Sequence, residues 1–238
     1  MTRGAAFYDR AYRTAGDRGS RWRELGAVGK ADHVEALLRD RPGRLVEIGC
    51  GDGALLAELA RRDAAASLAG FDVSEEAVRA AQARGLEHVE AFDGRRLPTG
   101  DDSFEVALLS HVLEHVDDPV TLLREAARVA STVVVEVPLE ASLSGRRGAK
   151  RRHSDAIGHV QVLDRAAARG LLAAAGLRVR DELMDPLPAA VHLFDAETAR
   201  ERAVARAKAT VRRALFAASP ALAARLFTVH WACVCTRE

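Results

Sequence analysis

The sequence predicts a single α/β domain organised around a mainly parallel β-sheet. From residue 44 onward, short β-branched or apolar runs alternate with helical patterns, which is typical of successive strand–helix units. The length of 238 residues fits one large domain of this class better than two small ones. A hydrophobic content of 48% is ample for a packed core, and 29% charged residues leave a well-solvated surface.

The strands are the clearest elements along the chain. The run 104–112 is apolar almost throughout, as expected of a central strand buried on both faces. STVVVEV at 131–137 is the most β-like segment. In order, strands are predicted at 44–50, 67–73, 88–93, 104–112, 131–137, 177–183 and 228–236.

Helices are predicted between the strands from their capping residues. Asp118 followed by Pro119 is a strong helix start, and Ser74 caps a helix with Glu75 and Glu76 in its first turn. The predicted helices cover 54–62, begin at Ser74, run from Asp118 to about Val129 and from Asp164 to Gly176, and cover 195–218. The polar, basic stretch 139–160 is predicted to be a loop.

These elements divide the chain into four parts. Residues 1–40 form an N-terminal helical cap, and 41–185 form the core of the domain. Residues 186–227 are a helical insertion, which is either a lid or a dimer surface, and 228–238 return to the core as its last strand.

Composition excludes several functional classes. A formal net charge of +1 gives no electrostatic basis for binding nucleic acid. Cys50, Cys233 and Cys235 lack the spacing of a disulfide framework or a zinc knuckle. The N-terminus has no apolar signal core, and the apolar stretch 214–235 is interrupted by charged residues and Pro220. We therefore expect a soluble, cytoplasmic protein that does not associate with membranes.

The stretch VEIGCGDG at 46–53 contains three alternating glycines and two acids, Glu47 and Asp52. GCGDGA also satisfies the dinucleotide pattern GxGxxG/A, in which a pyrophosphate binds at the helix N-terminus. A carboxylate beside that phosphate would cost roughly a kcal/mol or more. The two acids therefore favour a ligand that carries an ammonium or sulfonium group.

Two further acids end the next strands. Asp72 lies 19 residues beyond Gly53 and can accept both hydroxyls of an adenosine ribose. Asp93 is placed to accept a hydrogen bond from an adenine amino group. Because ligands of open α/β sheets lie at the carboxyl ends of strands, these acids and the glycine loop should share one crevice.

Taken in order, these motifs resemble class I S-adenosylmethionine-dependent methyltransferases of the small-molecule branch. The resemblance covers about residues 40–185 and is carried by the glycine loop, FDVS (71–74), FDG (92–94), LPTGDDSFEVALLSHVLEHVDDP (97–119) and GHVQVLDRAAARGLLAAAGL (158–177). It implies a Rossmann-like, doubly wound, seven-stranded and mainly parallel sheet, with helices on both faces, a helical lid and S-adenosylmethionine as cofactor. The chain departs from the family by placing some forty residues between its last two strands.

The resemblance also assigns cofactor-binding residues. The methionine end of the cofactor falls to Glu47, Gly49, Cys50, Gly51 and Gly53, and Asp72, with Val73 beside it, falls to the ribose. Asp93 and Gly94 would hold the adenine edge, with Ser110 and His111 near the sulfonium. Tyr8 and Tyr12 share one helix face, and tyrosines so placed in this family often close over the cofactor; packing on the sheet is the alternative.

Histidines are the candidate catalytic residues. HVLEH at 111–115 matches H-x-x-E-H, but it leaves a buried strand and runs into a helix cap, so a zinc-peptidase helix is not expected. We expect His111 to face the cofactor pocket, with Glu114 and His115 either lining it or fixing the turn. His153 and His159 follow the fifth strand, and either could be a general base, although a hydrogen bond from His159 that joins the loop to the following helix is the simpler interpretation.

Arg146, Arg147, Lys150, Arg151 and Arg152 crowd the same loop. They are either a solvated, flexible lid or a recognition site for an anionic group of the substrate.

We therefore predict methyl transfer from S-adenosylmethionine to an oxygen or nitrogen of a small molecule by in-line displacement. A nucleic-acid or protein methyltransferase is less favoured, because the basic loop has no interleaved aromatic residues and no binding domain is appended. An NAD(P)-dependent reductase would need a Tyr-x-x-x-Lys pair, which is absent. A non-catalytic scaffold would have no use for an intact glycine loop and Asp72. A homodimer through the 186–227 insertion remains open.

Overall fold

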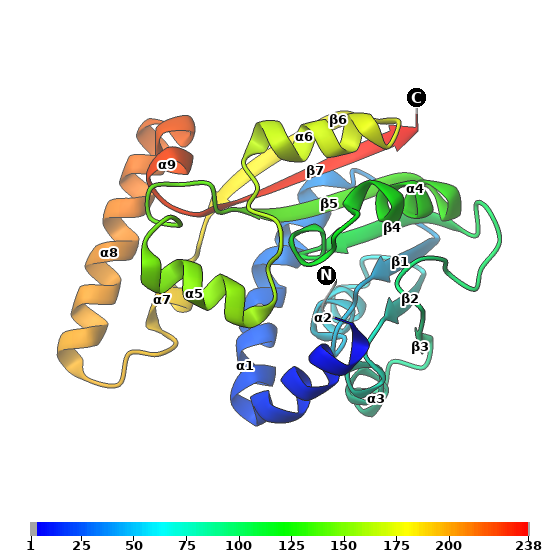
Figure 1. The fold of residues 1–238 in the computed structure, drawn as a ribbon, viewed down its shortest axis with the longest axis horizontal. Helices are drawn as coiled ribbons and strands as arrows, with labels where there is room; N and C mark the ends of the chain where they lie inside the picture. The colour runs from blue at the N-terminus through cyan, green and yellow to red at the C-terminus, as the bar shows by residue number, and fades with distance from the viewer. Residues whose placement is uncertain (1–3, 238) are drawn as a thin grey trace.

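The computed structural model describes residues 4–237, which form a seven-stranded sheet with helices on both faces (Figure 1). The strand order is β3-β2-β1-β4-β5-β7-β6. β7 pairs antiparallel with both β5 and β6, and the other neighbours pair parallel. The sheet confirms the predicted fold class.

The strands lie close to their predicted positions. Their bounds are β1 Arg44–Ile48, β2 Ser67–Asp72, β3 Val89–Ala91, β4 Phe104–Ser110, β5 Ala130–Leu139, β6 Leu177–Pro186 and β7 Val229–Arg237. The larger helices are α1 Ala5–Leu37, α2 Ala54–Arg61, α3 Glu75–Ala83, α4 Pro119–Val129, α6 Arg165–Ala174 and α8 Ala199–Ala218. Side chains of Ser74, Asp118 and Asp164 accept the N-cap hydrogen bonds of α3, α4 and α6, as their sequences predict.

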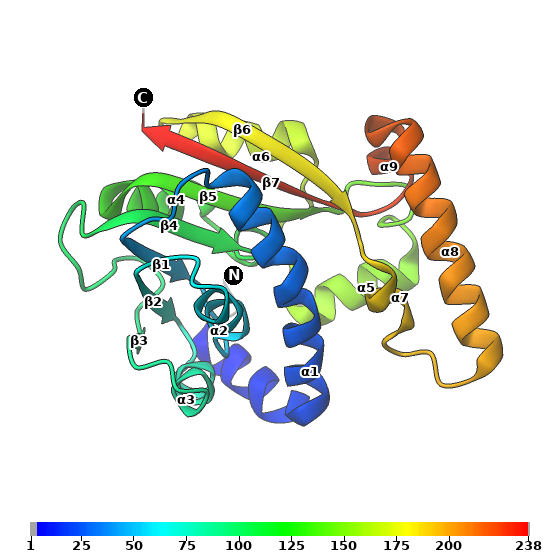
Figure 2. The ribbon, with the colours of Figure 1, turned by 180° about the vertical axis from the view of Figure 1, so that it is seen from behind.

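Each face of the sheet has its own hydrophobic core. On one face, Leu122, Leu123 and Leu172 of α4 and α6 pack with strand residues around the fully buried Trp231. On the other face, α1 and α2 pack over the strands through residues such as Val34 and Leu56 (Figure 2). This arrangement leaves the carboxyl ends of the parallel strands uncovered by either layer.

α1 bends sharply at Gly16, whose φ of 51° and ψ of −157° are not helical. This backbone conformation is essentially restricted to glycine. The bend lets residues 17–37 pack along the sheet while residues 5–15 cross the carboxyl ends of the strands (Figures 1 and 2). The N-terminal part of α1 therefore lies over this edge of the sheet.

Three short helices lie outside the ranges for which individual helices are predicted. α5 Gly148–Ile157 occupies much of the 139–160 stretch, so the prediction of a loop there is wrong. Arg147 at its N-cap forms no side-chain capping bond, so the usual start signal is missing from the sequence. α7 Ala189–Leu193 and α9 Pro220–Leu226 flank α8.

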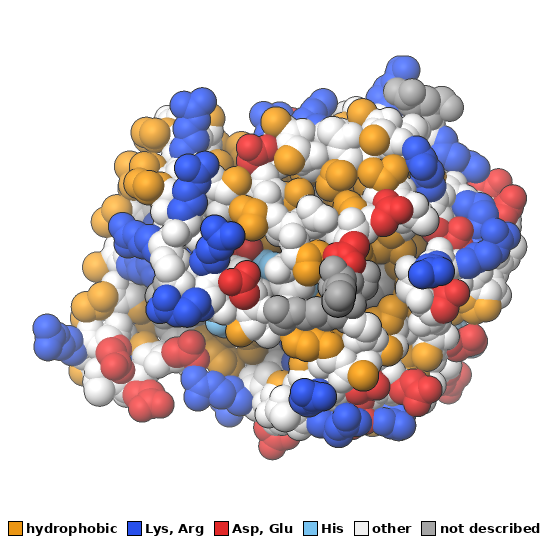
Figure 3. Space-filling view, viewed as in Figure 1, with side chains coloured by type: hydrophobic (Ala, Val, Ile, Leu, Met, Phe, Trp, Pro, Cys, Tyr) orange, Lys and Arg blue, Asp and Glu red, His pale blue; other side chains and the backbone are white. Residues whose placement is uncertain are grey.

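α8 and α9 project beyond the sheet and carry an exposed apolar stripe. Val204, Val211, Leu215 and Leu222 are exposed on these helices. Figure 3 shows Lys and Arg side chains gathered over the same side of the molecule, above α5 and α8. None of the helices within residues 4–237 combines the length and apolarity that crossing a bilayer requires.

Candidate active site

A cavity of about 1050 Å³ opens at the carboxyl ends of the parallel strands. This volume is at the upper end of the range of about 300–1,000 Å³ that is usual for ligand pockets. The cavity brings together the glycine loop, the ends of β2 and β3, the segment after β4, the start of α1 and the end of α5. Its lining comprises Gly4, Ala5, Tyr8, Ala11, Tyr12, Thr14, Ala15, Arg23, Ile48, Gly49, Asp72, Val73, Phe92, Asp93, Gly94, Arg95, His111, Val112, His115, Val116, Asp117, Asp118, Thr121, Leu122, Ala156 and Ile157.

The glycine loop follows β1 in left-handed backbone conformations. Gly49, Gly51 and Gly53 have φ values of 76°, 57° and 71°. A Cβ atom on Gly51 would lie 2.4 Å from the hydroxyl of Tyr12, so a larger residue would displace this tyrosine. The loop thus presents bare backbone, as predicted, and Tyr12 lies directly against it.

Asp72 joins this loop to the end of β2. Its carboxylate accepts hydrogen bonds from the backbone N–H groups of Gly51 (2.8 Å) and Ser74 (2.9 Å). The side chain is buried, which raises its pKa, and it lines the cavity beside Val73. Gly49, Asp72 and Asp93 therefore share one crevice.

Asp93 and Gly94 lie at the end of the cavity formed after β3. One carboxylate oxygen of Asp93 accepts from the N–H groups of Arg95 (2.8 Å) and Arg96 (2.9 Å), which fixes the turn. These two N–H groups hold the pKa of Asp93 below its usual value. Phe92 adds an apolar surface to the same end.

Asp52 does not face the cavity, contrary to the sequence argument. It is buried and accepts contacts from Arg23 (3.0 Å) and Arg84 (2.9 Å). Two guanidinium groups offset its charge, so Asp52 ties α1 to α3 and does not attract a cationic ligand. The sequence could not reveal this because both arginines are remote along the chain.

Glu47 is buried beneath the loop, outside the lining of the cavity. Burial raises its pKa to about 8, although Lys30 acts in the opposite direction. One of its carboxylate oxygens has no hydrogen-bond partner among residues 4–237. An acid with an unsatisfied oxygen therefore lies directly before the glycine loop.

Three other residues that are predicted to bind the cofactor contact other parts of the protein and do not line the cavity. The sulfur of Cys50 packs in the core beneath the loop, near Gly70. The hydroxyl of Ser110 donates to Glu136 at 3.3 Å, so it does not face the cavity. A Cβ atom on Gly53 would meet Leu86 and Ala81, so this glycine serves close packing between loop and helix.

His111 leaves β4 with a φ of 58°, an uncommon conformation for a residue with a side chain. Its ring lines the cavity and lies between two carboxylates, 3.2 Å from Glu114 and 3.5 Å from Glu136. Burial and Lys30 act to lower the pKa of His111, but these two carboxylates outweigh them and raise it.

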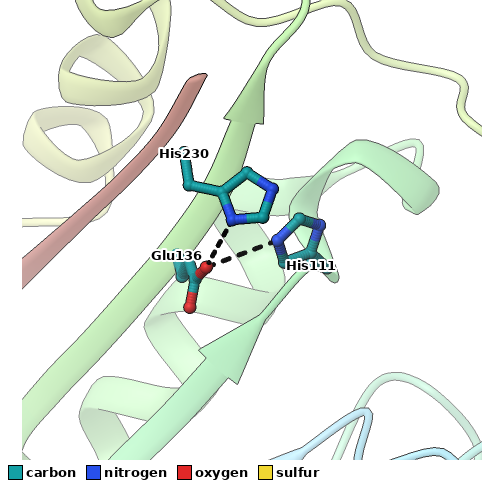
Figure 4. Close-up of side chains that lie close together, drawn as sticks. All are labelled: His111, Glu136 and His230. Carbon is teal, nitrogen blue, oxygen red and sulfur yellow. Dashed lines mark ion pairs between the residues drawn. The ribbon is translucent and has the colours of Figure 1, made fainter. Parts of the chain in front are cut away.

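Glu136 of β5 is surrounded by three histidines from three different elements. Its Oε1 lies 3.3 Å from His33 of α1, 3.5 Å from His111 and 3.1 Å from His230 of β7. Figure 4 shows His111 and His230 directed at this oxygen from neighbouring positions. Burial would raise the pKa of Glu136, but the histidines hold it well below its usual value. No sequence pattern indicates this cluster, because its members lie up to about 200 residues apart.

His115 is the second histidine that lines the cavity within residues 4–237. Tyr8 lies edge-on to its ring, with centroids 5.9 Å apart, and His159 lies on its other side at 4.7 Å. Burial and the neighbouring histidines lower the pKa of His115, although Glu114 acts to raise it. The HVLEH pattern draws attention to this residue, but the sequence does not place it among the catalytic candidates.

The other two catalytic candidates are not brought to the cavity. His159 bonds through Nδ1 to Glu140 at 2.8 Å, which fastens the segment after β5; its partner directly follows β5 and does not belong to the following helix, where the simpler interpretation expected it. His153 is exposed on α5, outside the lining, because the stretch is helical and this position faces solvent. Arg146, Arg147, Arg151 and Arg152 are likewise exposed, whereas Lys150 donates to Thr228 at 2.6 Å.

The H-x-x-E-H motif does not form a metal-binding helix. Residues Leu113–His115 form one 3-10 turn; His111 lies against Glu114 and Glu136, whereas the ring of His115 packs against that of His159. This agrees with the expectation that the motif is not a zinc-peptidase helix.

Comparison with known proteins identifies the family. Residues 21–182, more than half of the chain, match the family described as "Methyltransferase domain". The chain is a class I S-adenosylmethionine-dependent methyltransferase. S-adenosylmethionine is therefore the cofactor of this methyltransferase.

Solved structures share its fold over nearly the whole chain. A methyltransferase from Thermotoga maritima, described as a possible histamine N-methyltransferase, is 19% identical, covers 98% of this chain and 99% of its own, and has a TM-score of 0.67. The geranyl diphosphate C-methyltransferase of Streptomyces coelicolor, solved with S-adenosylhomocysteine, is 13% identical over 90% of this chain and 78% of its own, with a TM-score of 0.61.

Curated relatives match less than half of the methyltransferase. The ubiquinone biosynthesis O-methyltransferase of Hahella chejuensis is 36% identical over 96 residues, which is 37% of this chain and 40% of that protein. Its counterpart in Xanthomonas oryzae is 32% identical over 106 residues, or 42% and 44% of the two chains. The chain thus spans about two fifths of the length of these relatives.

Proposed function

We propose that this methyltransferase transfers a methyl group to an oxygen atom, or alternatively a nitrogen atom, of a small molecule by in-line displacement. The observation that carries this proposal is one cavity that is lined both by cofactor-binding features and by two histidines. The O-methyltransferase names of the curated relatives support oxygen, and the name of the Thermotoga protein keeps nitrogen as the alternative.

The cofactor-binding features of the cavity fit S-adenosylmethionine. The carboxylate of Asp72 is suited to bind the ribose hydroxyls, and Asp93 and Gly94 are suited to bind the adenine edge. The backbone around Gly49 is suited to bind the methionine end. Glu47, buried and unsatisfied beneath the loop, would gain a favourable partner from the ammonium group. The bound cofactor supplies a methyl group already activated by its sulfonium. Tyr12 and Tyr8 would cover it and exclude water.

We assign to His115 the role of the general base that accepts the proton of the methyl acceptor. It lines the cavity, and because its pKa is lowered, it is neutral near neutral pH and able to accept a proton. As the acceptor oxygen loses its proton to His115, its electron pair forms the new bond to the methyl carbon. The cofactor held by the glycine loop and Asp72 would supply the methyl group and would keep the electron pair of the carbon–sulfur bond.

The walls near His115 suggest the type of acceptor. Ala5, Val116, Ala156 and Ile157 provide apolar surface in the same cavity as the two histidines. Such a pocket favours an aromatic or aliphatic molecule with one reactive hydroxyl or amine over a nucleic acid or a protein. Recognition of an anionic group by Arg151 and Arg152, and a homodimer through residues 186–227, stay predictions.

Two measurements test the proposal. Calorimetric titration should show binding of S-adenosylmethionine and S-adenosylhomocysteine but not NADH. A screen of phenols, aliphatic alcohols and amines with S-adenosylmethionine should then yield a methylated product. Tight NADH binding without S-adenosylmethionine binding would contradict the proposal.

Replacing His115 tests its role. His115→Asn should lower kcat by about 10²–10⁴-fold, because this is the usual contribution of a general base, and should leave cofactor affinity unchanged. In the wild type, kcat/KM should fall as the pH drops through a pKa below 6.5, since protonated His115 cannot accept a proton. This acid limb should disappear in the variant. The exposed His88 gives a matched control, His88→Asn, which should retain the wild-type rate and pH profile.

A further inference from the structure

Three buried polar atoms point at one place beside the cavity without forming hydrogen bonds. They are His33 Nδ1, His111 Nε2 and Glu136 Oε1; the two nitrogens lie 3.3 and 3.5 Å from Glu136 Oε1 as ion pairs, but none of the three atoms has a hydrogen bond within residues 4–237. Buried polar groups are nearly always hydrogen-bonded. Three such atoms at one site indicate that a bound species belongs there.

The spacing of these atoms matches that of metal ligands. Donor atoms of His111, Glu136 and His230 all lie within 4.8 Å of one another. Glu136 Oε1 is 3.5 Å from His111 Nε2 and 3.1 Å from His230 Nδ1. Ligand atoms bonded to a tetrahedral zinc ion at about 2.0–2.1 Å lie about 3.3–3.4 Å apart. The three side chains therefore need little movement to hold one ion (Figure 4).

The surroundings also orient these side chains as ligands. The other nitrogen of His111, Nδ1, lies 3.2 Å from Glu114, and a carboxylate behind a histidine is the usual second contact of metal-bound histidine. Glu136 Oε2 accepts from Ser110, which leaves Oε1 for the ion. His33 lies between Glu136 (3.3 Å) and Asp185 (3.5 Å), so it can position the carboxylate.

A second cluster of candidate ligands is less suitable. Glu114, His115 and His159 also have donor atoms within 4.8 Å of one another. His159, however, already uses Nδ1 to bond Glu140 at 2.8 Å. In the first cluster, by contrast, His111 has a ring nitrogen, Nε2, that forms no hydrogen bond and is available to a metal ion. We therefore prefer the first cluster.

We propose that His111, Glu136 and His230 bind one divalent transition-metal ion, best matched by Zn²⁺, in the wall of the cavity. Two histidines and one glutamate are a ligand set of catalytic zinc sites, which keep a fourth position open. Glu136 is only 1% exposed, whereas the His111 side chain is 21% exposed and lines the cavity. The open position therefore faces the space available to the methyl acceptor.

The role of this ion rests on the proposed function, whereas its binding does not. An acceptor oxygen bound at the open position would have a lower pKa, and it would lose its proton to His115 more readily. The ion would also select acceptors with a hydroxyl group able to reach it.

Metal binding is tested directly on the untagged full chain. After removal of metals with a chelator and dialysis, the protein should bind one equivalent of Zn²⁺ in competition with a metal-sensitive dye. Co²⁺ should bind in place of Zn²⁺ and give the visible absorption of a four-coordinate site with nitrogen and oxygen ligands. Absence of stoichiometric Zn²⁺ binding would overturn the proposal.

Variants locate the site. His230→Ala and Glu136→Gln should each weaken Zn²⁺ binding by roughly 100-fold or more, and His33→Gln, which removes only a positioning residue, by about 10–100-fold. The exposed His88→Ala is the control and should bind Zn²⁺ like the wild type. Unchanged affinity in both His230→Ala and Glu136→Gln would overturn the assignment. The Co²⁺ absorption of the wild type tests the proposal even if one of the variants fails to fold.

These measurements separate the two proposals. A chain that binds Zn²⁺ as described but methylates no phenol, alcohol or amine contradicts the proposed function alone. A chain that methylates an acceptor at the same rate after complete metal removal, without binding Zn²⁺, contradicts the metal site alone.

Discussion

The buried carboxyl group of Glu47 lowers the stability of the folded enzyme, and a bound cofactor would offset this loss. Its carboxyl group is buried next to the glycine loop and has an oxygen without a hydrogen-bond partner among the described residues. Burial raises its pKa from 4.5 to about 8. The folded protein therefore favours the protonated form, whereas the unfolded chain ionises this group above pH 4.5.

This difference predicts a pH-dependent stability. The contribution of Glu47 to the free energy of unfolding is fully present below pH 4.5, and it is lost as the pH rises through about 8. Without cofactor, Glu47→Gln should be more stable than the wild type at pH 9, by on the order of 2 kcal/mol, and the difference should shrink towards pH 5. Urea denaturation at several pH values measures it. Glu90→Gln, at an exposed glutamate of β3, is the control; parallel curves for Glu47→Gln and the wild type would contradict the prediction.

Asp72 should contribute most of the affinity for the ribose. A hydrogen bond to a charged group is worth about 1.5–3 kcal/mol, so Asp72→Asn should raise the dissociation constant of S-adenosylmethionine by roughly 10–150-fold. Asparagine still accepts one backbone N–H, so the turn should persist. Calorimetry measures the affinity, with Asp40→Asn at an exposed position as the control. A change of less than threefold would show that Asp72 does not hold the ribose.

The position of some site residues could be predicted from the sequence, whereas that of others could not. Asp72 and Asp93 end strands, and parallel strands bring their carboxyl ends together, so their shared crevice follows from the pattern. The orientations of Cys50 and Ser110 depend on the left-handed turns after β1 and β4. The pairing of Asp52 with two arginines, and the histidines around Glu136, need tertiary contacts that no local pattern contains.

The N-terminal half of α1 is an element that should open and close. It supplies Tyr8 and Tyr12 to the cavity, and Asp9 accepts hydrogen bonds from the Ser74 hydroxyl (2.6 Å) and the Glu76 N–H (3.2 Å). These bonds to the start of α3, together with an ion pair between Arg13 and Glu76 at 3.7 Å, fasten the segment there. Because the segment lines the cavity, we expect it to move when the cofactor enters.

The bend at Gly16 sets the position of this cover. Among residues 4–237, no atom lies within 4 Å of the place that a Cβ atom on Gly16 would occupy, so replacement is opposed by backbone strain alone. Gly16→Ala should cost about 1–3 kcal/mol in the closed form and raise KM for S-adenosylmethionine, with a smaller effect on kcat. Steady-state kinetics test this, and Gly26→Ala, at an uncrowded glycine within the regular part of α1, is the control. Equal KM values in all three proteins would show that the bend does not control the cover.

Elements are predictable where local signals are strong. β4 and β5 are apolar runs, and α3, α4 and α6 begin at side chains that cap them, so sequence and structure agree closely. α5 lacks a capping side chain, and its basic composition is also typical of loops, so its sequence does not reveal the helix. Secondary structure of this kind is stabilised by tertiary packing more than by local preference.

For the molecule as a whole, cofactor binding should be visible as stabilisation. A ligand at 100 times its dissociation constant adds about 2.7 kcal/mol, which for a chain of this size corresponds to a rise in Tm of about 5–11 °C. S-adenosylmethionine and S-adenosylhomocysteine should both produce it in a thermal scan, and NADH should not. A Tm raised only by NADH would contradict the family's cofactor in this chain.

The position of β7 has a consequence for synthesis of the protein. This strand lies between β5 and β6, carries the fully buried Trp231, and delivers His230 to Glu136. On the ribosome, β1 to β5 can pair as they emerge, but β6 has no neighbour until residues 229–237 follow it. A nascent chain stalled before that point would expose one open edge of its sheet, and it would be a substrate for chaperones before it could be an enzyme.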